Sequence, residues 1–432
     1  MPFRLLLLIA LAGFLPQAGG LTAGERALLA AVDANNEAAL ALLERVVNIN
    51  SGTMNFAGVR DVGRVFRAEF DALGFTTEWV DGTPFGRAGH LVAEHPGQGP
   101  RFLLIGHLDT VFEPDSPFQK FERVSPIAAK GPGITDMKGG NVVMLHALKA
   151  LQSTGQLRSM NIVVVLTGDE ESAGRPLTQS RAALVKAAQG ADVAIGFEDG
   201  DGNPATAVIA RRGTTNWELR VTGTPAHSSQ IFNAENGYGA VFETARILNA
   251  FREKLAGQPH LTFNPGVILG GTAVEFDRPA SRGTGFGKSN VIAEHAVVFG
   301  DLRALSPQQF ADAKKAMQDI VAASLPRTSA AITFDDGYPA MAPTPGNERL
   351  LTLYNRASVD VGAGEVIAVN PDLAGAADVS FIAGHAGMIL DGVGLMGTGG
   401  HTVNETADLS TLPAMTRRMA VLLSRLQRDG VR

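Results

Sequence analysis

The amino-acid sequence contains no cysteine. This absence excludes disulfide bonds, a lipid-anchored cysteine, thiol nucleophiles and zinc sites built from thiolates. Any metal ion must therefore be held by His, Asp and Glu side chains. Because no covalent cross-link can form, the stability of the fold must come from its packed core.

The sequence also lacks a surplus of positive charge. Its 37 Lys and Arg residues are outnumbered by 43 Asp and Glu residues, which gives a net charge of −6 and a pI near 5.9. A nucleic-acid partner or an anionic membrane surface is therefore not expected. The length of 432 residues and the hydrophobic content of 45% suit a globular chain of about two to three domains.

Long apolar runs are missing as well, except at the N-terminus. Arg4 is followed by an apolar stretch over residues 5–15, and small residues follow at 18–20. This order is typical of a secretory signal peptide, which we place at residues 1–20. The run is too short for a membrane-spanning helix, and a buried N-terminal helix is the alternative. We expect an exported protein, periplasmic or secreted, with no membrane association after cleavage.

Helical and strand-like segments alternate through the first half of the chain. Apolar residues recur at helical spacing in four segments, 27–47, 59–73, 144–151 and 177–188. Short apolar runs predict three buried strands, over 102–105, 162–166 and 193–196. This alternation predicts an α/β fold with a largely parallel sheet. The pattern resumes near the C-terminus, over 350–358, 366–369, 388–391 and 412–426.

The middle of the chain has a different pattern. Apolar and polar residues alternate in three segments, 215–221, 261–269 and 296–302, and helical stretches cover 238–255 and 307–325. Such alternation predicts antiparallel strands in a smaller α+β unit inserted into the first domain. We place this unit at residues 213–326, between two segments of the first domain at 21–212 and 327–432. The stretch 277–287, rich in Gly and Pro, predicts a surface loop.

Candidate ligands follow each of the three predicted buried strands. His107 and Asp109 come after the first strand, Glu170 and Glu171 after the second, and Glu198 after the third. The carboxyl ends of parallel strands meet at one edge of a sheet, where open α/β folds bind ligands. Each motif alone has a simpler alternative. The His-x-Asp pair could form only a local hydrogen bond, and the two glutamates could lie in a solvated loop. Adjacent carboxylates at a buried strand end are nevertheless costly unless a positive group lies nearby.

Two glycine-rich segments carry further candidate ligands. Asp136 lies in the loop 131–140, which runs into a predicted helix, and His401 lies among glycines in 397–402. A helix cap for Asp136 and an ordinary loop histidine for His401 are the alternatives. Five separated segments that each offer a ligand in a loop together indicate a metal site made of imidazole and carboxylate groups.

In order and spacing, these motifs resemble the M20 family of metallopeptidases, and especially its glutamate carboxypeptidase branch, over nearly the whole chain after the signal peptide. The resemblance implies a zinc-exopeptidase-like catalytic domain with an inserted α+β lid and dimerisation domain. It also implies two Zn²⁺ ions per subunit. By this match His107 and Glu198 hold one ion, Glu171 and His401 hold the other, and Asp136 bridges the two.

The resemblance further implies roles in catalysis. Asp109 would orient His107, and Glu170 would be the general base, which takes a proton from the attacking water and returns it to the leaving nitrogen. His227 would stabilise the oxyanion. In the family this histidine commonly comes from the partner subunit of a homodimer.

Asn290 and Arg303 match the substrate residues of the family, and the planar group of an arginine suits a carboxylate. The alternatives are a turn histidine without a role for His227 and a salt bridge to Asp301 for Arg303. The glutamate-preferring branch carries a basic residue where 335–339 has none, so an acidic side-chain preference is not predicted. Six histidines match no motif of the family and are assigned structural positions, namely His90, His95, His146, His260, His295 and His385.

These assignments predict a zinc carboxypeptidase that hydrolyses the amide bond to a C-terminal amino acid in small peptides or N-acyl amino acids. An N-acyl amino acid deacylase of the same family is the main alternative, and a non-catalytic exported binding protein is a less favoured one. An aminopeptidase would have to recognise a free amine, whereas Asn290 and Arg303 suit a carboxylate.

Overall fold

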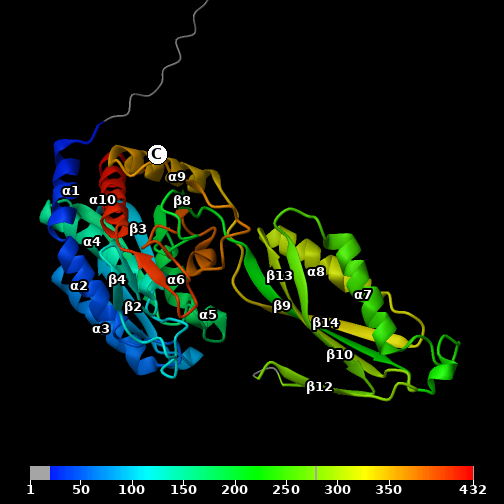
Figure 1. Cartoon of the computed structure of the whole chain (residues 1–432). Coiled ribbons are helices and arrows are strands. Elements are labelled where there is room, and N and C mark those ends of the chain that lie inside the picture. The colour runs from blue at the N-terminus through cyan, green and yellow to red at the C-terminus, as the bar shows by residue number, and fades with distance from the viewer. Residues whose placement is uncertain (1–19, 278–279, 432) are drawn as a thin grey trace, which may run out of the picture.

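The computed structural model describes residues 20–277 and 280–431. Nearly all of the predicted signal peptide lies outside the described residues. The described chain forms a larger lobe, which holds both of its ends, and a smaller lobe built from the middle of the sequence (Figure 1). No helix in the described part combines the length and the hydropathy that crossing a membrane requires.

The larger lobe is organised around a six-stranded sheet. Its strands lie in the order β1 (Thr76–Asp81), β2 (Gly89–His95), β6 (Met160–Thr167), β3 (Gln98–His107), β7 (Val193–Gly196) and β16 (Met388–Leu390). β3, β6, β7 and β16 run parallel to one another, and β2 runs antiparallel to its neighbours β1 and β6. The three predicted buried strands are confirmed as β3, β6 and β7, and their carboxyl ends lie at the same edge.

Helices cover both faces of this sheet. Phe102 and Leu104 of β3 lie in one core, whereas Leu103 and Ile105 lie in a second core on the opposite face. The first core includes α1 (Ala23–Ala34), α2 (Asn36–Val47), α3 (Phe56–Ala72), α4 (Gly140–Ser153), α9 (Pro345–Asp360) and α10 (Thr411–Asp429). Burial on both faces explains why the strands read as continuous apolar runs.

Two predicted helices are interrupted. The helix expected over 27–47 breaks at Asn35, whose side-chain amide donates to a backbone carbonyl one turn earlier and so competes with the helical backbone. The helix expected over 177–188 divides at Arg181 into α5 (Leu177–Ser180) and α6 (Ala182–Ala188). The guanidinium of Arg181 is held by buried carboxylates of neighbouring loops, so tertiary contacts override the helical pattern here.

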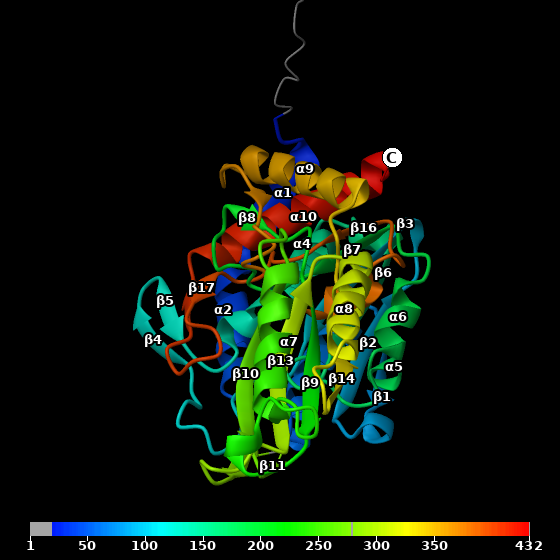
Figure 2. The same ribbon diagram turned by 90° about the vertical axis from the view of Figure 1, so that its right-hand side faces the viewer.

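The smaller lobe contains a four-stranded antiparallel sheet. Its order is β10 (Thr262–Gly271), β13 (His295–Ala304), β9 (Gly213–Gly223) and β14 (Thr328–Asp336). The helices α7 (Gly239–Leu255) and α8 (Pro307–Ala322) pack on one face of it (Figure 2). The alternating segments and both helices predicted in the middle of the chain are therefore confirmed.

Two expectations for this lobe are wrong. The inserted unit does not end at 326, because β14 pairs with β9 and its Ile332 and Phe334 pack against the core of this sheet. The stretch 277–287 is not a plain loop, since its residues extend a hairpin of β11 (Ala273–Asp277) and β12 (Arg282–Phe286). Phe276 of this hairpin stacks on Phe299 of β13 with ring centroids 4.0 Å apart, which holds it against the sheet.

Two small sheets complete the larger lobe. One has the order β17 (Gly397–Thr398), β18 (Thr406–Asp408), β5 (Ala128–Lys130) and β4 (Glu122–Ser125), and the other pairs β8 (Thr206–Ala207) with β15 (Ile367–Ala368). The strand expected over 366–369 is thus reduced to two residues. The pairing of β5 with β18 brings the loop that carries His401 beside the turn that carries Asp136, although 265 positions separate the two residues.

Candidate metal centre

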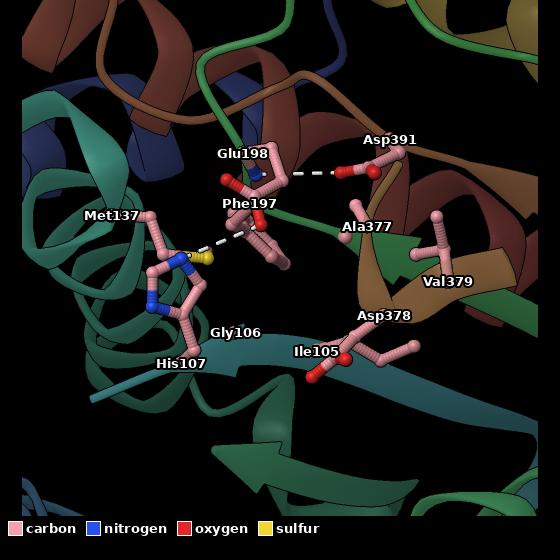
Figure 3. A pocket seen from close by; sticks show the side chains of 11 residues that line it. Ile105, Gly106, His107, Met137, Phe197, Glu198, Ala377, Asp378, Val379 and Asp391 are labelled. Carbon is pink, nitrogen blue, oxygen red and sulfur yellow. Dashed lines mark hydrogen bonds and ion pairs between the residues drawn. The ribbon is translucent and has the colours of Figure 1, made fainter. Parts of the chain in front are cut away.

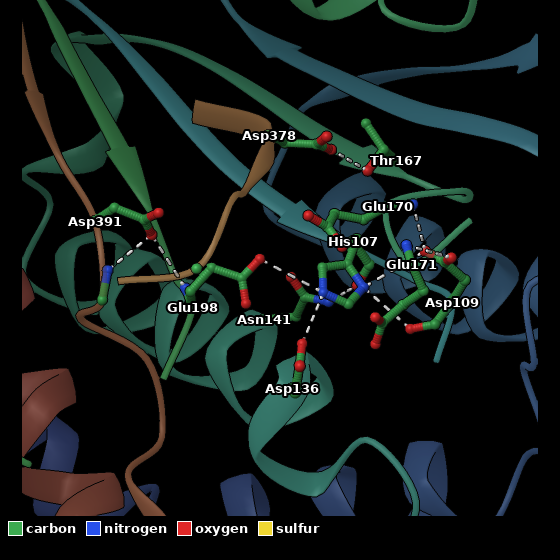
Figure 4. Close-up of polar contacts among 12 residues, drawn as sticks. His107, Asp109, Asp136, Asn141, Thr167, Glu170, Glu171, Glu198, Asp378 and Asp391 are labelled. Carbon is green, nitrogen blue, oxygen red and sulfur yellow. Dashed lines mark hydrogen bonds and ion pairs between the residues drawn. The ribbon is translucent and has the colours of Figure 1, made fainter. Parts of the chain in front are cut away.

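The candidate ligands converge at the carboxyl edge of the six-stranded sheet. His107 ends β3, Glu171 follows β6 and Glu198 follows β7, as expected for ligands in an open α/β sheet. Asp136 comes from the irregular turn that precedes α4, and His401 comes from the loop between β17 and β18. Figure 4 shows most of these side chains pointing toward one another.

The five side chains form two groups that share Asp136. In the first group, His107 Nε2 lies 3.0 Å from Asp136 Oδ1 and 3.5 Å from Glu198 Oε1. In the second, His401 Nε2 lies 2.9 Å from Asp136 Oδ2 and 3.2 Å from Glu171 Oε2. The candidate ligand atoms of each group lie within 4.8 Å of one another. Each carboxylate oxygen of Asp136 therefore faces a different group, which is the geometry of a bridging ligand.

The electrostatics of the cluster fit divalent cations. Burial and the nearby Asp136 raise the pKa of Glu171 to about 7, and burial likewise raises the pKa of Glu198 to about 8. Glu171 Oε1 is buried and has no hydrogen-bond partner among the described residues. Grouped buried carboxylates with an unpaired oxygen are costly unless a cation compensates them. Mixed imidazole and carboxylate ligands suit zinc and related borderline cations.

Asp109 supports this cluster from behind. His107 Nδ1 lies 3.0 Å from the Asp109 backbone oxygen and 3.5 Å from its carboxylate, which places Asp109 where it can orient the ring. The Asp109 carboxylate also accepts the backbone N–H groups of Glu170 and Glu171, at 3.0 and 3.1 Å, and the hydroxyl of Thr53. One buried side chain thus holds the candidate ligand His107 and the segment that carries Glu170 and the candidate ligand Glu171.

Glu170 is beside the two groups but belongs to neither of them. Burial raises its pKa well above the ordinary value of a glutamate. Its backbone is held at both ends, because its N–H donates to Asp109 and its carbonyl accepts the hydroxyl of Tyr338. A small hollow lined by His107, Glu198 and Asp378 lies at the same edge of the sheet (Figure 3).

Two supporting carboxylates escaped the sequence analysis. The fully buried Glu405 accepts the backbone N–H groups of Gly133, Thr135 and Asp136 at 3.0, 2.8 and 3.2 Å. Asp391 accepts the backbone N–H of Glu198 at 3.3 Å. Glu405 could have been suspected from the sequence because it lies four residues after the candidate ligand His401. No sequence feature near Asp391 indicates that it supports the site.

Replacing Glu405 with Gln should weaken metal binding. The Gln amide nitrogen would face backbone donors that now meet a carboxylate, and the turn that presents Asp136 would shift. We expect metal affinity to fall by about 10–100-fold, measured by competition with a chelator. The exposed Glu348 provides a control, since Glu348→Gln should leave the affinity unchanged. Equal affinities of the two variants would show that Glu405 does not support the centre.

The structure does not bring the other predicted site residues to this cluster. His227 is exposed, and its Nδ1 lies 2.8 Å from the hydroxyl of Ser229. The segments of His227 and Asn290 are neighbours, because the N–H of Ser228 donates to the Asn290 carbonyl. Arg303 Nε lies 3.1 Å from Asp301 Oδ2, the salt bridge considered as its alternative. All three candidates lie in the smaller lobe.

The comparison with known families identifies the family of the chain. The profile of peptidase family M20/M25/M40 matches residues 103–425. The chain belongs to this family. The resemblance drawn from the ligand motifs is therefore confirmed, and so is the mixed α/β fold with a catalytic and a lid part that it implied.

Two hydrolases are similar to this chain, one along most of its length and one along about half of it. Carboxypeptidase G2 of Pseudomonas sp. (strain RS-16) is 26% identical over 395 residues, which cover 90% of this chain and 89% of the relative. Succinyl-diaminopimelate desuccinylase of Maricaulis maris is 30% identical over 225 residues, which cover 49% of this chain and 55% of the relative.

Solved structures show the same fold. An aminopeptidase of Bacillus cereus superposes with a TM-score of 0.72 at 19% identity, covering 91% of this chain and 99% of that structure. A dinuclear metal-binding M20 peptidase of Bacillus subtilis gives a TM-score of 0.64 at 14% identity, covering 92% and 99%. The Bacillus subtilis peptidase binds two metal ions, and this chain has two candidate ligand groups.

Proposed function

We propose that this chain is a zinc-dependent carboxypeptidase that hydrolyses the amide bond to a C-terminal amino acid. The observation that carries the proposal is the pair of ligand groups sharing Asp136, with Glu170 beside them and outside both. Similarity to carboxypeptidase G2 along most of both chains supports the choice of reaction. Small peptides and N-acyl amino acids are the proposed substrates.

The residues of the cluster suit an amide hydrolysis. Two bound zinc ions would lower the pKa of water and polarise the scissile carbonyl. Glu170 would take the proton of the attacking water and deliver it to the leaving nitrogen. Its held backbone keeps the carboxylate near the centre. Asn290 and Arg303 would bind the free carboxylate of the substrate.

The hydrolysis of N-acyl amino acids, N-benzyloxycarbonyl amino acids and dipeptides, each with and without chelator, tests this function. We expect chelator-sensitive release of a C-terminal residue. The corresponding C-terminal amides should be poor substrates, because they lack the carboxylate that Arg303 would bind. Zinc-loaded protein that releases nothing from any substrate would favour a non-catalytic binding protein. Analysis of the bound metal would test zinc against cobalt or manganese.

A deacylase of N-acyl amino acids is the second candidate. The similarity to the desuccinylase of Maricaulis maris, which covers 49% of this chain, favours it. Both reactions use the same amide chemistry and differ in the acyl side of the substrate. Within the substrate panel, faster hydrolysis of short N-acyl amino acids than of dipeptides would favour the deacylase.

We also propose that the chain acts as a homodimer in which His227 serves the partner's site. His227 is exposed in the smaller lobe, as a residue that crosses an interface would be before assembly. β10 is an edge strand of its sheet, and Val241 and Phe242 on α7 and Ile268 on β10 are exposed apolar side chains. An unpaired strand edge with apolar neighbours suits a symmetric contact with a second copy.

Light scattering should therefore give about twice the monomer mass for the processed protein. Placing a charge in the interface with Ile268→Lys should yield a monomer with normal metal content and a rate lowered by about 10²-fold or more, because the oxyanion loses a donor. Glu348→Lys, a charge change on the larger lobe, should affect neither property. A fully active monomer would remove both the dimer and His227 from the mechanism.

Export remains part of the proposal. The charged start, the apolar run over 5–15 and the small residues at 18–20 support it. Sequencing the N-terminus of protein recovered outside the cytoplasm should show a chain that begins near residue 21. Recovery of the intact N-terminus from the cytoplasm alone would contradict it.

A further inference from the structure

The two lobes are joined by two chain segments that lie side by side, one before β9 and one after β14 (Figure 1). Arg211 and Met341 exchange two backbone hydrogen bonds of 2.9 Å. The Thr214 N–H donates to the Tyr338 carbonyl at 2.8 Å, and the Gly337 N–H donates to the Thr214 carbonyl at 3.0 Å. These four hydrogen bonds fix the backbone of Tyr338 within the connection between the lobes.

The side chain of Tyr338 leaves this connection and enters the larger lobe. Its hydroxyl lies 2.8 Å from Arg181 Nη2 and 2.6 Å from the Glu170 carbonyl oxygen. An arginine can only donate hydrogen bonds, so the hydroxyl must accept from Arg181 and direct its own proton to Glu170. The ring packs edge-on against Phe381, with centroids 4.8 Å apart, which leaves the hydroxyl little freedom.

Arg181 is itself a fixed group. It is 1% exposed, and it pairs with Asp169 at 2.6 Å and with Asp378 at 2.8 Å. Asp378 also accepts the hydroxyl of Thr167 at the end of β6. A planar guanidinium with several charged partners has a defined orientation. The position of the Tyr338 hydroxyl is therefore set by the packing of its ring and by this buried network.

The Glu170 backbone is consequently held from two directions. Its N–H donates to Asp109, which belongs to the metal-ligand segment after β3, and its carbonyl accepts from Tyr338, which belongs to the connection between the lobes. We propose that Tyr338 is a positioning residue whose hydroxyl holds the backbone from which the Glu170 side chain projects. This inference rests on the proposed role of Glu170 as general base.

Tyr338→Phe tests the proposal, because it keeps the ring against Phe381 and removes only the hydroxyl. We expect kcat to fall by about tenfold, the loss of roughly one hydrogen bond, with KM changed by less than about twofold and metal content unchanged. Amide hydrogen exchange over residues 168–172 should become faster. The matched control is Tyr354→Phe, since Tyr354 is a buried tyrosine of α9 near Met415, and both readouts should stay unchanged.

An unchanged kcat together with unchanged exchange in Tyr338→Phe would overturn the proposal. So would a lower kcat that accompanies metal loss or faster exchange throughout the chain, because the hydroxyl would then support the fold in general. If the unaltered protein hydrolyses no substrate, the proposed function fails by itself. The exchange comparison still decides in that case whether Tyr338 holds the segment of Glu170.

Discussion

Replacing Glu170 with Gln should lower kcat by roughly 10²–10⁴-fold, the range measured for a lost general base, while leaving the metal content unchanged. The structure separates the two properties because Glu170 lies outside both ligand groups. Gln preserves the size of the side chain and the backbone contacts to Asp109 and Tyr338. The loss should therefore appear in the chemical step, with little change in KM.

The adjacent Glu171 supplies the matched comparison for this prediction. Its Oε2 lies 3.2 Å from His401 Nε2 in the second ligand group. Glu171→Gln should lose metal from that group, and its activity should fall for that reason. The two variants differ by one position in the chain, so their metal contents isolate the two roles. Metal loss in Glu170→Gln would instead make Glu170 a ligand, and an active Glu170→Gln enzyme would need another base.

The carboxylates that hold the ligand segments follow one pattern. Asp109 accepts the amides of Glu170 and Glu171, Asp391 accepts that of Glu198, and Glu405 accepts three in the turn of Asp136. Buried backbone N–H groups need a hydrogen-bond acceptor, and these carboxylates supply one. The cluster is thus surrounded by acceptors that fix loops, which limits the movement of its ligands when a cation binds.

The sequence predicted the ligands better than their supports. Parallel strands bring His107, Glu171 and Glu198 to one edge of the sheet, so their positions after apolar runs placed them together. The family resemblance was still needed to choose Glu171 over its neighbour Glu170 as the ligand. Glu405 and Asp391 act on backbone groups 193 to 272 positions away in sequence. A local sequence pattern cannot predict these hydrogen bonds. The pairing of β18 with β5 brings Glu405 to its backbone donors, and the parallel sheet brings Asp391 to Glu198.

The end of the inserted lobe could not be predicted from the sequence either. Its strands and helices followed from their periodicity, but β14 lies beyond Pro326, which served as the predicted boundary. That proline only connects α8 to β14, and the pairing of β14 with β9 decides where the lobe ends. The place of Tyr338 is a further example, since its hydrogen bond to Glu170 spans 168 positions. Such contacts depend on how the two lobes are joined.

Replacing Asp136 with Ala should remove both of the proposed metal ions at once. Each of its oxygens faces a histidine of a different group, at 3.0 and 2.9 Å, so one substitution takes a ligand from each site. The loss of affinity should exceed the roughly 10–100-fold expected for a supporting residue such as Glu405. Activity should disappear with the metal, because Glu170 alone cannot activate water or polarise the carbonyl.

Variants of ligands that belong to one group only distinguish the loss of both ions from general unfolding of the protein. Glu198→Ala and His401→Ala each remove a ligand from one group only. Each of these variants should therefore lose one ion and still bind the other, whereas Asp136→Ala should bind neither tightly. Zinc that binds the folded state raises the melting temperature with its concentration, which gives a readout independent of catalysis. That rise should be reduced in the two single-site variants and nearly absent in Asp136→Ala. If Asp136→Ala still bound one ion as tightly as the unaltered protein, Asp136 would serve a single site and the shared geometry would not reflect a bridge.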